Sequence, residues 1–234
     1  MIETRIFHDK VKGYAFCICT GFLESILLYG ENEVLSKMEM LLYTDIKSKK
    51  KKDEFLKSRY LAKLAIKELY ENGEVFLWDV EIGKGVMNNP IILGKYSEYS
   101  VSISHSSGYV AVVAYKKNLM VGVDIEPIKF NKAYSNLWLS EYEKQCKPKN
   151  MNEALYGLAI WTCKEALGKC VCLGLQVNYD IYTVKSVSLE EGILKSTFSN
   201  FHGLVAYTFL KKKFMLTIVL PKTLEISGVV PGGE

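Results

Sequence analysis

Residues 121–126 read VGVDIE, and this stretch alternates in the manner of a β-strand. Because successive side chains of a strand point to opposite faces, Gly122, Asp124 and Glu126 lie on one face. Two carboxylates on one face of an apolar strand raise each other's pKa unless a cation lies between them. The stretch therefore predicts a strand that either holds a divalent cation such as Mg²⁺, which prefers oxygen ligands, or exposes two solvated acids at a sheet edge.

A second pattern lies in residues 152–169, which have the apolar spacing of an α-helix. Trp161, Glu165 and Lys169 recur at every fourth position and therefore lie on one face of that helix. Lys164 lies about 100° around the helix from Glu165, so it can reach a ligand from the side. The alternative is an ordinary amphipathic helix whose Glu165–Lys169 pair contributes only a few tenths of a kcal/mol.

The third pattern is a hydroxyl-rich turn at residues 102–108, which read SISHSSG. Serine hydroxyls, turn N–H groups and the imidazole of His105 are hydrogen-bond donors suited to an anion such as phosphate. One alternative is a turn whose serines cap the backbone. Another is nucleophilic catalysis by Ser104 or Ser106 with His105, but the sequence lacks the G-x-S-x-G elbow of such sites.

The composition is that of an ordinary soluble globular protein, with 234 residues of which 49% are apolar and 24% are charged. None of the six cysteines forms a CxxC pair and no secretory start is present, so we expect reduced thiols in a cytoplasmic protein. The longest apolar runs are too short to cross a bilayer, so we expect no membrane partner.

Lysines crowd together at Lys47 and at residues 49–52, although the net charge is only +4. The cluster indicates an anionic partner, or else a solvated loop or helix start. A nucleic-acid-binding function is a rival interpretation, but it lacks a known binding motif and leaves the paired acids unexplained. We therefore expect no nucleic acid among the partners.

The order of the predicted elements is that of an α+β protein, with a β-rich half containing one helix, then a second helix and more strands. We expect strands 109–115 and 120–126 to pair as a hairpin across Lys117 and Asn118. The helices are predicted at residues 58–70 and 152–169, and the strands at 14–20, 101–104, 109–115, 120–126, 179–187, 193–198, 204–210 and 214–220.

Together, the three patterns resemble the surfactin-synthetase-activating type of 4′-phosphopantetheinyl transferase. That family combines a Ser-His turn, a Gly-x-Asp-x-Glu strand and, about forty residues later, Trp-x-x-Lys-Glu-x-x-x-Lys; all three occur here in the same order and spacing. The resemblance covers roughly residues 45–176. One departure is visible, because the family's Gly-Lys-Pro element reads Asn88-Asn89-Pro90, so Asn89 replaces a lysine that contacts coenzyme A.

The resemblance implies a magnesium-dependent transfer of the phosphopantetheine arm of coenzyme A to a serine of an acyl or peptidyl carrier protein, with release of 3′,5′-ADP. The implied fold has two similar lobes related by a pseudo-twofold axis, each a small antiparallel sheet with a packed long helix, and coenzyme A between them. We expect a lobe at residues 1–115 with the nucleotide-end contacts and a lobe at residues 116–234 with the metal and catalytic residues. The family analogy also implies a monomer.

The resemblance also implies roles for individual residues. The magnesium ligands are expected to be Asp124, Glu126 and Glu165. The catalytic set is expected to be Glu165, which activates the carrier serine, with Lys169 and Asp124. Coenzyme A is expected to contact Lys169 and Lys164 at the pyrophosphate, and Arg59, Ser104, His105 and a lysine among 49–52 at the nucleotide end.

A rival of the same fold is a non-catalytic module that binds coenzyme A or another nucleotide. Such a module would keep the phosphate contacts but would not need three carboxylates, so the joint presence of Asp124, Glu126 and Glu165 favours the transferase. The sequence leaves open which carrier protein and pathway the enzyme serves and whether it accepts acylated coenzyme A.

Overall fold

The computed structural model describes residues 2–9, 14–26, 30–128, 139–174 and 177–224. The chain divides into two compact units, Met1–Leu119 and Met120–Glu234, which we call unit 1 and unit 2. Each unit is an antiparallel sheet with one long helix packed on it, which confirms the predicted α+β class. No helix within the described ranges is long and apolar enough to span a membrane.

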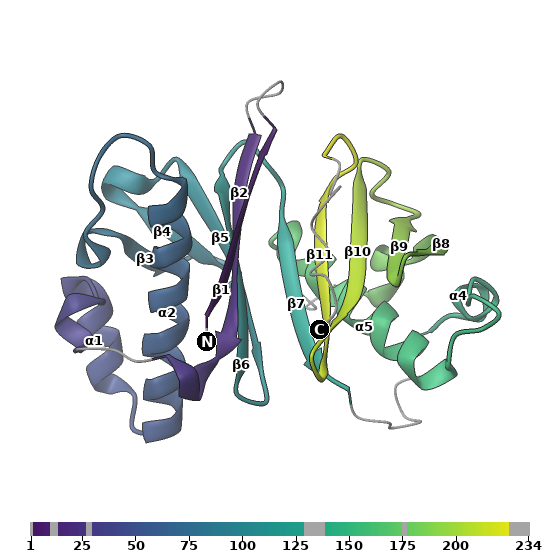
Figure 1. Ribbon diagram of the computed structural model, residues 1–234, viewed down its shortest axis with the longest axis horizontal. Coiled ribbons are helices and arrows are strands. Elements are labelled where there is room, and N and C mark those ends of the chain that lie inside the picture. Colours follow the sequence, from purple (N-terminus) through teal and green to yellow (C-terminus); the bar gives the residue numbers. More distant parts are fainter. Residues whose placement is uncertain (1, 10–13, 27–29, 129–138, 175–176, 225–234) are drawn as a thin grey trace. The chain divides into compact units, whose positions relative to one another are not determined.

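The main sheet of unit 1 has the strand order β1-β2-β6-β5, and β3 and β4 form a separate two-stranded sheet. Its long helix α2 packs against β6, β2 and β5 (Figure 1). The elements are β1 (Glu3–Asp9), β2 (Tyr14–Phe22), α1 (Lys37–Asp45), α2 (Lys49–Leu69), β3 (Glu81–Lys84), β4 (Pro90–Leu93), β5 (Tyr99–Ser106) and β6 (Tyr109–Lys116). Short 3-10 turns occur at Leu23–Ser25, Glu31–Glu33, Leu77–Asp79 and Gly94–Tyr96.

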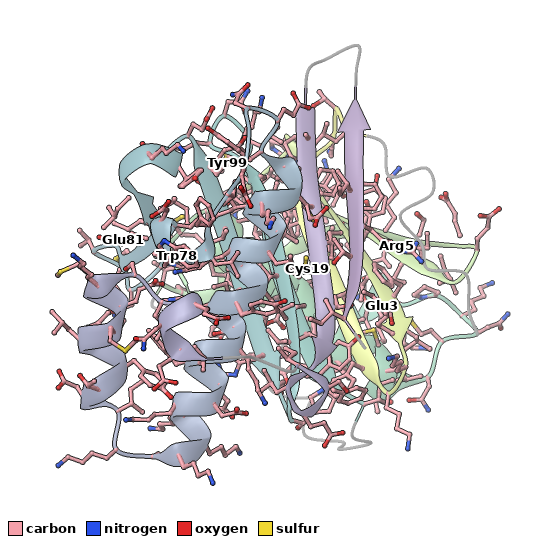
Figure 2. The ribbon with its side chains drawn as sticks, turned by 60° about the vertical axis from the view of Figure 1, so that its left-hand side comes forward. Glu3, Arg5, Cys19, Trp78, Glu81 and Tyr99 are labelled. Carbon is pink, nitrogen blue, oxygen red and sulfur yellow. The ribbon has the colours of Figure 1, made fainter. Side chains whose placement is uncertain are left out.

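Helix α2 is longer than the sequence predicts and contains the four lysines at 49–52 in its first turn. It begins after Ser48, whose side chain accepts a hydrogen bond from the backbone N–H of Lys51 and so caps the helix. The face toward the sheet consists of small and aliphatic side chains, all at most 2% exposed: Leu61, Ala62, Ala65, Ile66 and Leu69. Cys19 of β2 lies on the sheet face that α2 covers, in the same apolar core (Figure 2).

The predicted hairpin across Lys117 and Asn118 is wrong. Strand β6 pairs instead with β5 and β2, all within unit 1. The turn between β5 and β6 is Ser107-Gly108, and both residues have positive φ, 48° and 78°, as the tight two-residue hairpin turn requires. The division between the units falls directly after this strand, so the next strand belongs to unit 2.

The sheet of unit 2 has the strand order β7-β11-β10-β9-β8, and helix α5 packs against β7, β11 and β10 (Figure 1). Asn152 caps α5 by accepting hydrogen bonds from the N–H groups of Ala154 and Leu155. Residues 179–182, predicted as part of a strand, form a 3-10 turn, Tyr179–Tyr182. The other elements are β7 (Gly122–Pro127), α4 (Glu141–Gln145), α5 (Glu153–Cys170), β8 (Val184–Glu190), β9 (Ile193–Phe198), β10 (Leu204–Lys211) and β11 (Phe214–Pro221).

Candidate functional site

Gly122 brings strand β7 and helix α5 unusually close together. A Cβ atom at this position would overlap the carbonyl oxygen of Ala166 and would lie 2.6 Å from the backbone nitrogen of Cys170. Backbone atoms of a helix interior cannot move aside as a flexible side chain can, so only glycine fits here. Since Asp124 lies on the same face of β7 as Gly122, this close approach places the Asp124 carboxylate beside the last turns of α5.

From Tyr156 onward, α5 is buried except for one stripe. Trp161, Glu165 and Lys169 are partly exposed, whereas every other residue from Tyr156 to Cys170 is buried. These three are the residues that the fourfold spacing puts on one face. The stripe is therefore the part of residues 156–170 that can meet a ligand.

Lys169 and Asp124 form an ion pair within unit 2. The Lys169 Nζ donates to the Asp124 Oδ1 at 2.7 Å, and Asp124 is only 3% exposed. A buried carboxylate needs a nearby positive charge, because removing it from water is costly. Lys169 supplies that charge.

Glu165 shares the environment of both acids on β7. Its burial, followed by the negative charge of Asp124 and then that of Glu126, raises the pKa of Glu165 to about 7, although Lys169 opposes the shift. The structure thus brings Asp124, Glu126, Glu165 and Lys169 into one electrostatic cluster. At neutral pH the Glu165 carboxyl group can both hold and release a proton.

The donor chemistry of this cluster fits a hard divalent cation. The negative charges of Asp124 and Glu126 add to the effect of burial in raising the pKa of Glu165, and a cation between the three carboxylates would offset their repulsion. In the described part of the chain, no group of three or more His, Cys, Asp and Glu side chains is gathered closely enough to enclose a metal ion. Mg²⁺ does not need such a cage, because it usually takes one or two carboxylates together with waters and substrate phosphates.

Lys164 has a different environment from the other motif residues. Its side chain is only 4% exposed, and its Nζ donates to the Glu143 Oε2 at 2.9 Å. Glu143 is fully buried at the start of α4. Sequence reasoning missed this glutamate, although Ser140-Glu-Tyr-Glu143 has the Ser-x-x-Glu form of a helix capping box.

Two tyrosines adjoin the exposed stripe and were also missed. Tyr179 stacks on Trp161 with ring centroids 6.0 Å apart. Burial, followed by the charge of Glu165, raises the pKa of Tyr179 and of Tyr182. The Tyr182 hydroxyl donates to the Gly174 carbonyl at 2.6 Å, which fixes the chain just after α5. The sequence gives no periodic signal for these residues, because they lie in a short turn.

Unit 1 contains a pocket of ≈ 440 Å³ that unites several of the residues expected to bind a nucleotide. Arg59 and His105 both line it, together with Lys51 from the lysine cluster. Ser104 is buried on β5 and is not among the lining residues, which are Ile46, Lys51, Glu54, Phe55, Ser58, Arg59, Pro90, Ile103 and His105. The lining therefore combines two cations, Lys51 and Arg59, and one acid, Glu54, with several apolar side chains, and such a mixture can take a nucleotide with a phosphate.

Arg59 is held firmly at the wall of this pocket. Its Nε lies 3.2 Å from the Glu39 Oε1, and its guanidinium lies 4.8 Å from the centre of the Phe55 ring. Burial lowers the pKa of Arg59, and the charge of Glu39 opposes that shift. The side chain is 10% exposed, so it reaches the pocket from a largely buried position.

Residues 120–218 match the family model of the 4′-phosphopantetheinyl transferase superfamily. The match contains β7 and α5, and with them Asp124, Glu126, Glu165 and Lys169. It supports a transferase of this kind, in a superfamily whose members generally use coenzyme A and a metal ion. The comparison with curated proteins found no match.

Proposed function

We propose that the protein transfers the 4′-phosphopantetheine arm of coenzyme A to a serine of an acyl or peptidyl carrier protein and releases 3′,5′-ADP. The observation that carries this proposal is the cluster that Gly122 makes possible, in which an acidic strand meets Glu165 and Lys169 on the exposed stripe of α5. The family match over residues 120–218 supports the same class of reaction.

In this proposal Asp124, Glu126 and Glu165 hold a magnesium ion. When bound, the ion neutralises negative charge on the pyrophosphate, which is the usual contribution of magnesium to phosphoryl-type transfer. The expected Mg²⁺ dependence rests on the carboxylate oxygens that these three side chains offer, and it does not require a closed cage of protein ligands.

The reacting groups are a serine hydroxyl and the pyrophosphate of coenzyme A. The serine oxygen attacks the phosphorus that carries the pantetheine, and the bond from that phosphorus to the bridging oxygen breaks. Glu165 accepts the serine proton, directly or through water, as a carboxylate general base. The bridging oxygen leaves with its electron pair as part of 3′,5′-ADP.

Lys169 stabilises the charge that develops on the leaving group. Its ammonium pairs with Asp124. A cation bound at Asp124 would replace that partner, which leaves the ammonium able to donate to a pyrophosphate oxygen. The same lysine thus places a positive charge beside the carboxylates before substrate binds and beside the pyrophosphate afterwards.

We assign the nucleotide end of coenzyme A to the pocket of unit 1. Arg59, His105 and Lys51 line that pocket and are suited to its 3′-phosphate. Ser104, also expected at the nucleotide end, precedes His105 on β5 but is buried and is not among the residues that line the pocket. Asn89, which replaces the family's lysine, is not needed for any of these contacts.

Intact-mass measurement of candidate apo carrier proteins tests the proposal. Each carrier from fatty-acid, polyketide and peptide synthesis is incubated with the protein, coenzyme A and Mg²⁺. We expect one carrier to gain the mass of one phosphopantetheine arm, with no gain in the presence of a chelator or when its acceptor serine is replaced by alanine. If every carrier stays unmodified while the protein binds coenzyme A, the non-catalytic binding module is the correct interpretation.

A further inference from the structure

The two units contain the same arrangement of a short helix and a long helix. In unit 1, Ser36 and Glu39 form a capping box at the start of α1: the Ser36 N–H donates to the Glu39 Oε2 at 2.9 Å, and the Glu39 N–H donates to the Ser36 Oγ at 3.2 Å. Lys63 of α2 donates to the same Oε2 and also to the Val34 carbonyl at 2.7 Å. Glu39 and Lys63 are both completely or almost completely buried.

Unit 2 repeats this arrangement at the start of α4. The Ser140 N–H donates to the Glu143 Oε2 at 2.9 Å, and the Glu143 N–H donates to the Ser140 Oγ at 3.2 Å. Lys164 of α5 donates to the same Oε2 at 2.9 Å. The second oxygen of Glu143, Oε1, accepts from the Val184 N–H at 2.9 Å, so this carboxylate also binds the first residue of β8.

The repeated arrangement indicates that the buried lysine of each unit has a structural role. Lys63 is not part of the expected metal or catalytic set, yet like Lys164 it is buried and pairs with a capping-box glutamate. A capping-box glutamate that binds a buried lysine of the following long helix is therefore a structural feature of both units. The placement of Lys164 follows from this feature without any phosphate ligand.

We propose that Glu143 and Lys164 are positioning residues for the transfer reaction, and that Lys164 is not a ligand of the pyrophosphate. This inference rests on the proposed function. Lys164 and Glu165 are adjacent on α5 and point about 100° apart. Holding the Lys164 ammonium inward on Glu143 therefore fixes the rotation of α5 at which Glu165 and Lys169 face outward.

Further contacts extend the effect of the pair beyond α5. The Tyr156 hydroxyl, from the first turn of α5, donates to the Glu143 carbonyl at 2.6 Å. Together with the bond from Val184, this connects α4 to both α5 and the edge strand of the sheet. A change at Glu143 thus alters the rotation of α5, whereas a phosphate ligand would alter the affinity for the nucleotide.

The test compares Glu143→Gln, Lys164→Met and the double variant Glu143→Gln/Lys164→Met. Three quantities are measured for each: the thermal midpoint, the kcat and KM for coenzyme A with Mg²⁺, and the calorimetric affinity for 3′,5′-ADP. Kinetics are run at a temperature at which every variant is fully folded. Lys164→Arg serves as the conservative control, because it keeps a positive charge at the same place.

We expect Lys164→Met to lower the thermal midpoint by roughly 10 °C, because it leaves a buried carboxylate without its cation. The double variant should regain at least about half of that loss, because both charges are then gone. We expect kcat to fall about tenfold in each single variant and to recover partly in Lys164→Arg, with the KM for coenzyme A and the affinity for 3′,5′-ADP within about twofold of wild type.

Two results would overturn the inference. One is a tenfold weaker affinity for coenzyme A or 3′,5′-ADP in the double variant after its thermal midpoint has recovered, since this would make Lys164 a phosphate ligand. The other is an unchanged kcat in both single variants. If the proposed function is wrong, the wild-type protein itself transfers nothing. The thermal midpoint and the affinity for 3′,5′-ADP need no turnover, so they test the role of Lys164 separately.

Discussion

Unit 1 and unit 2 share a plan but differ in what their long helices expose. Helix α2 begins with exposed lysines and carries Arg59 at a pocket wall, whereas α5 exposes a carboxylate between an aromatic ring and a lysine. The buried glutamates differ in the same way. Each accepts a capping bond from a serine N–H. Glu39 then binds two cations, Lys63 and Arg59, while Glu143 binds one cation and the N–H of Val184.

This difference shows how one scaffold can support two kinds of chemistry. In unit 1 the buried glutamate directly holds a residue that we expect to contact substrate, Arg59. In unit 2 the buried glutamate, Glu143, holds Lys164, which is the neighbour of Glu165. It cannot hold Glu165 itself, because two carboxylates repel each other. We therefore expect changes in unit 1 to affect nucleotide binding, and changes in unit 2 to affect the rate of transfer.

The largest expected effect is the loss of either central carboxylate of unit 2. Asp124→Ala and Glu165→Ala should each reduce transfer at least ~1,000-fold, because a cation ligand or the general base is lost. Circular dichroism should show that both variants remain folded. Glu190→Ala, an exposed acid on β8 of the same unit, serves as the control and should keep its activity. Full activity of both central variants would refute the assignment.

A second large effect is expected at the contact between β7 and α5. Gly122→Ala introduces a Cβ that overlaps helix backbone, so it should destabilise the protein by about 3 kcal/mol and lower its thermal midpoint by roughly 6–12 °C. Transfer should fall as well, because α5 must move away from Asp124. Gly203→Ala in the same unit is the matched control, since a Cβ there would meet nothing within 4 Å. Equal thermal midpoints for Gly122→Ala and Gly203→Ala would show that β7 and α5 are not in tight contact at Gly122.

An intermediate effect is expected in unit 1 and should concern binding. Arg59→Ala should weaken the calorimetric affinity for 3′,5′-ADP roughly 10- to 100-fold, as expected for a lost charge-assisted contact. Its kcat at saturating coenzyme A should change much less than that of Glu165→Ala. Lys67→Ala, an exposed lysine at the other end of α2, should leave the affinity unchanged. A lower kcat with an unchanged affinity for 3′,5′-ADP in Arg59→Ala would contradict the proposal that unit 1 serves nucleotide binding and unit 2 serves transfer.

The smallest expected effect is a dependence of stability on pH through Glu165. Its folded-state pKa is raised from 4.5 to about 7, so the folded protein holds this proton more tightly than the unfolded chain does. The resulting stabilisation is complete below pH 4.5 and is lost as the pH rises toward 7. In chelator, the stability of Glu165→Gln relative to wild type should therefore increase across this range and then level off. A constant difference between the two proteins would show that the pKa of Glu165 is ordinary.

The sequence predicts unit 2 better than unit 1, for local reasons. The alternation of residues 121–126 and the fourfold spacing on α5 are periodic signals, and both elements form where they predict. The N-cap at Asn152 also follows from local chemistry. These signals are sufficient to place the acids on one strand face and Glu165 and Lys169 on one helix face.

The remaining features depend on contacts between distant residues. Glu39 meets Lys63 across 24 positions and Glu143 meets Lys164 across 21, and only packing decides which lysine fills each place. The capping boxes are visible as Ser-x-x-Glu, but their charged partners are not. The pairing of β6 was mispredicted for the same reason, because a short connection after a strand does not show whether the next strand joins the same sheet.

The single exposed stripe of α5 has a consequence for how this segment tolerates mutation. At the buried positions, a substitution mainly reduces the amount of folded protein. At Trp161, Glu165 and Lys169, the fold tolerates more kinds of side chain, so contacts with substrate determine which residue is kept. A saturation scan that records abundance and transfer separately should divide the helix into two classes of position. Folding and chemistry then impose separate requirements on neighbouring residues of one helix, with Lys164 in the first class and Glu165 in the second.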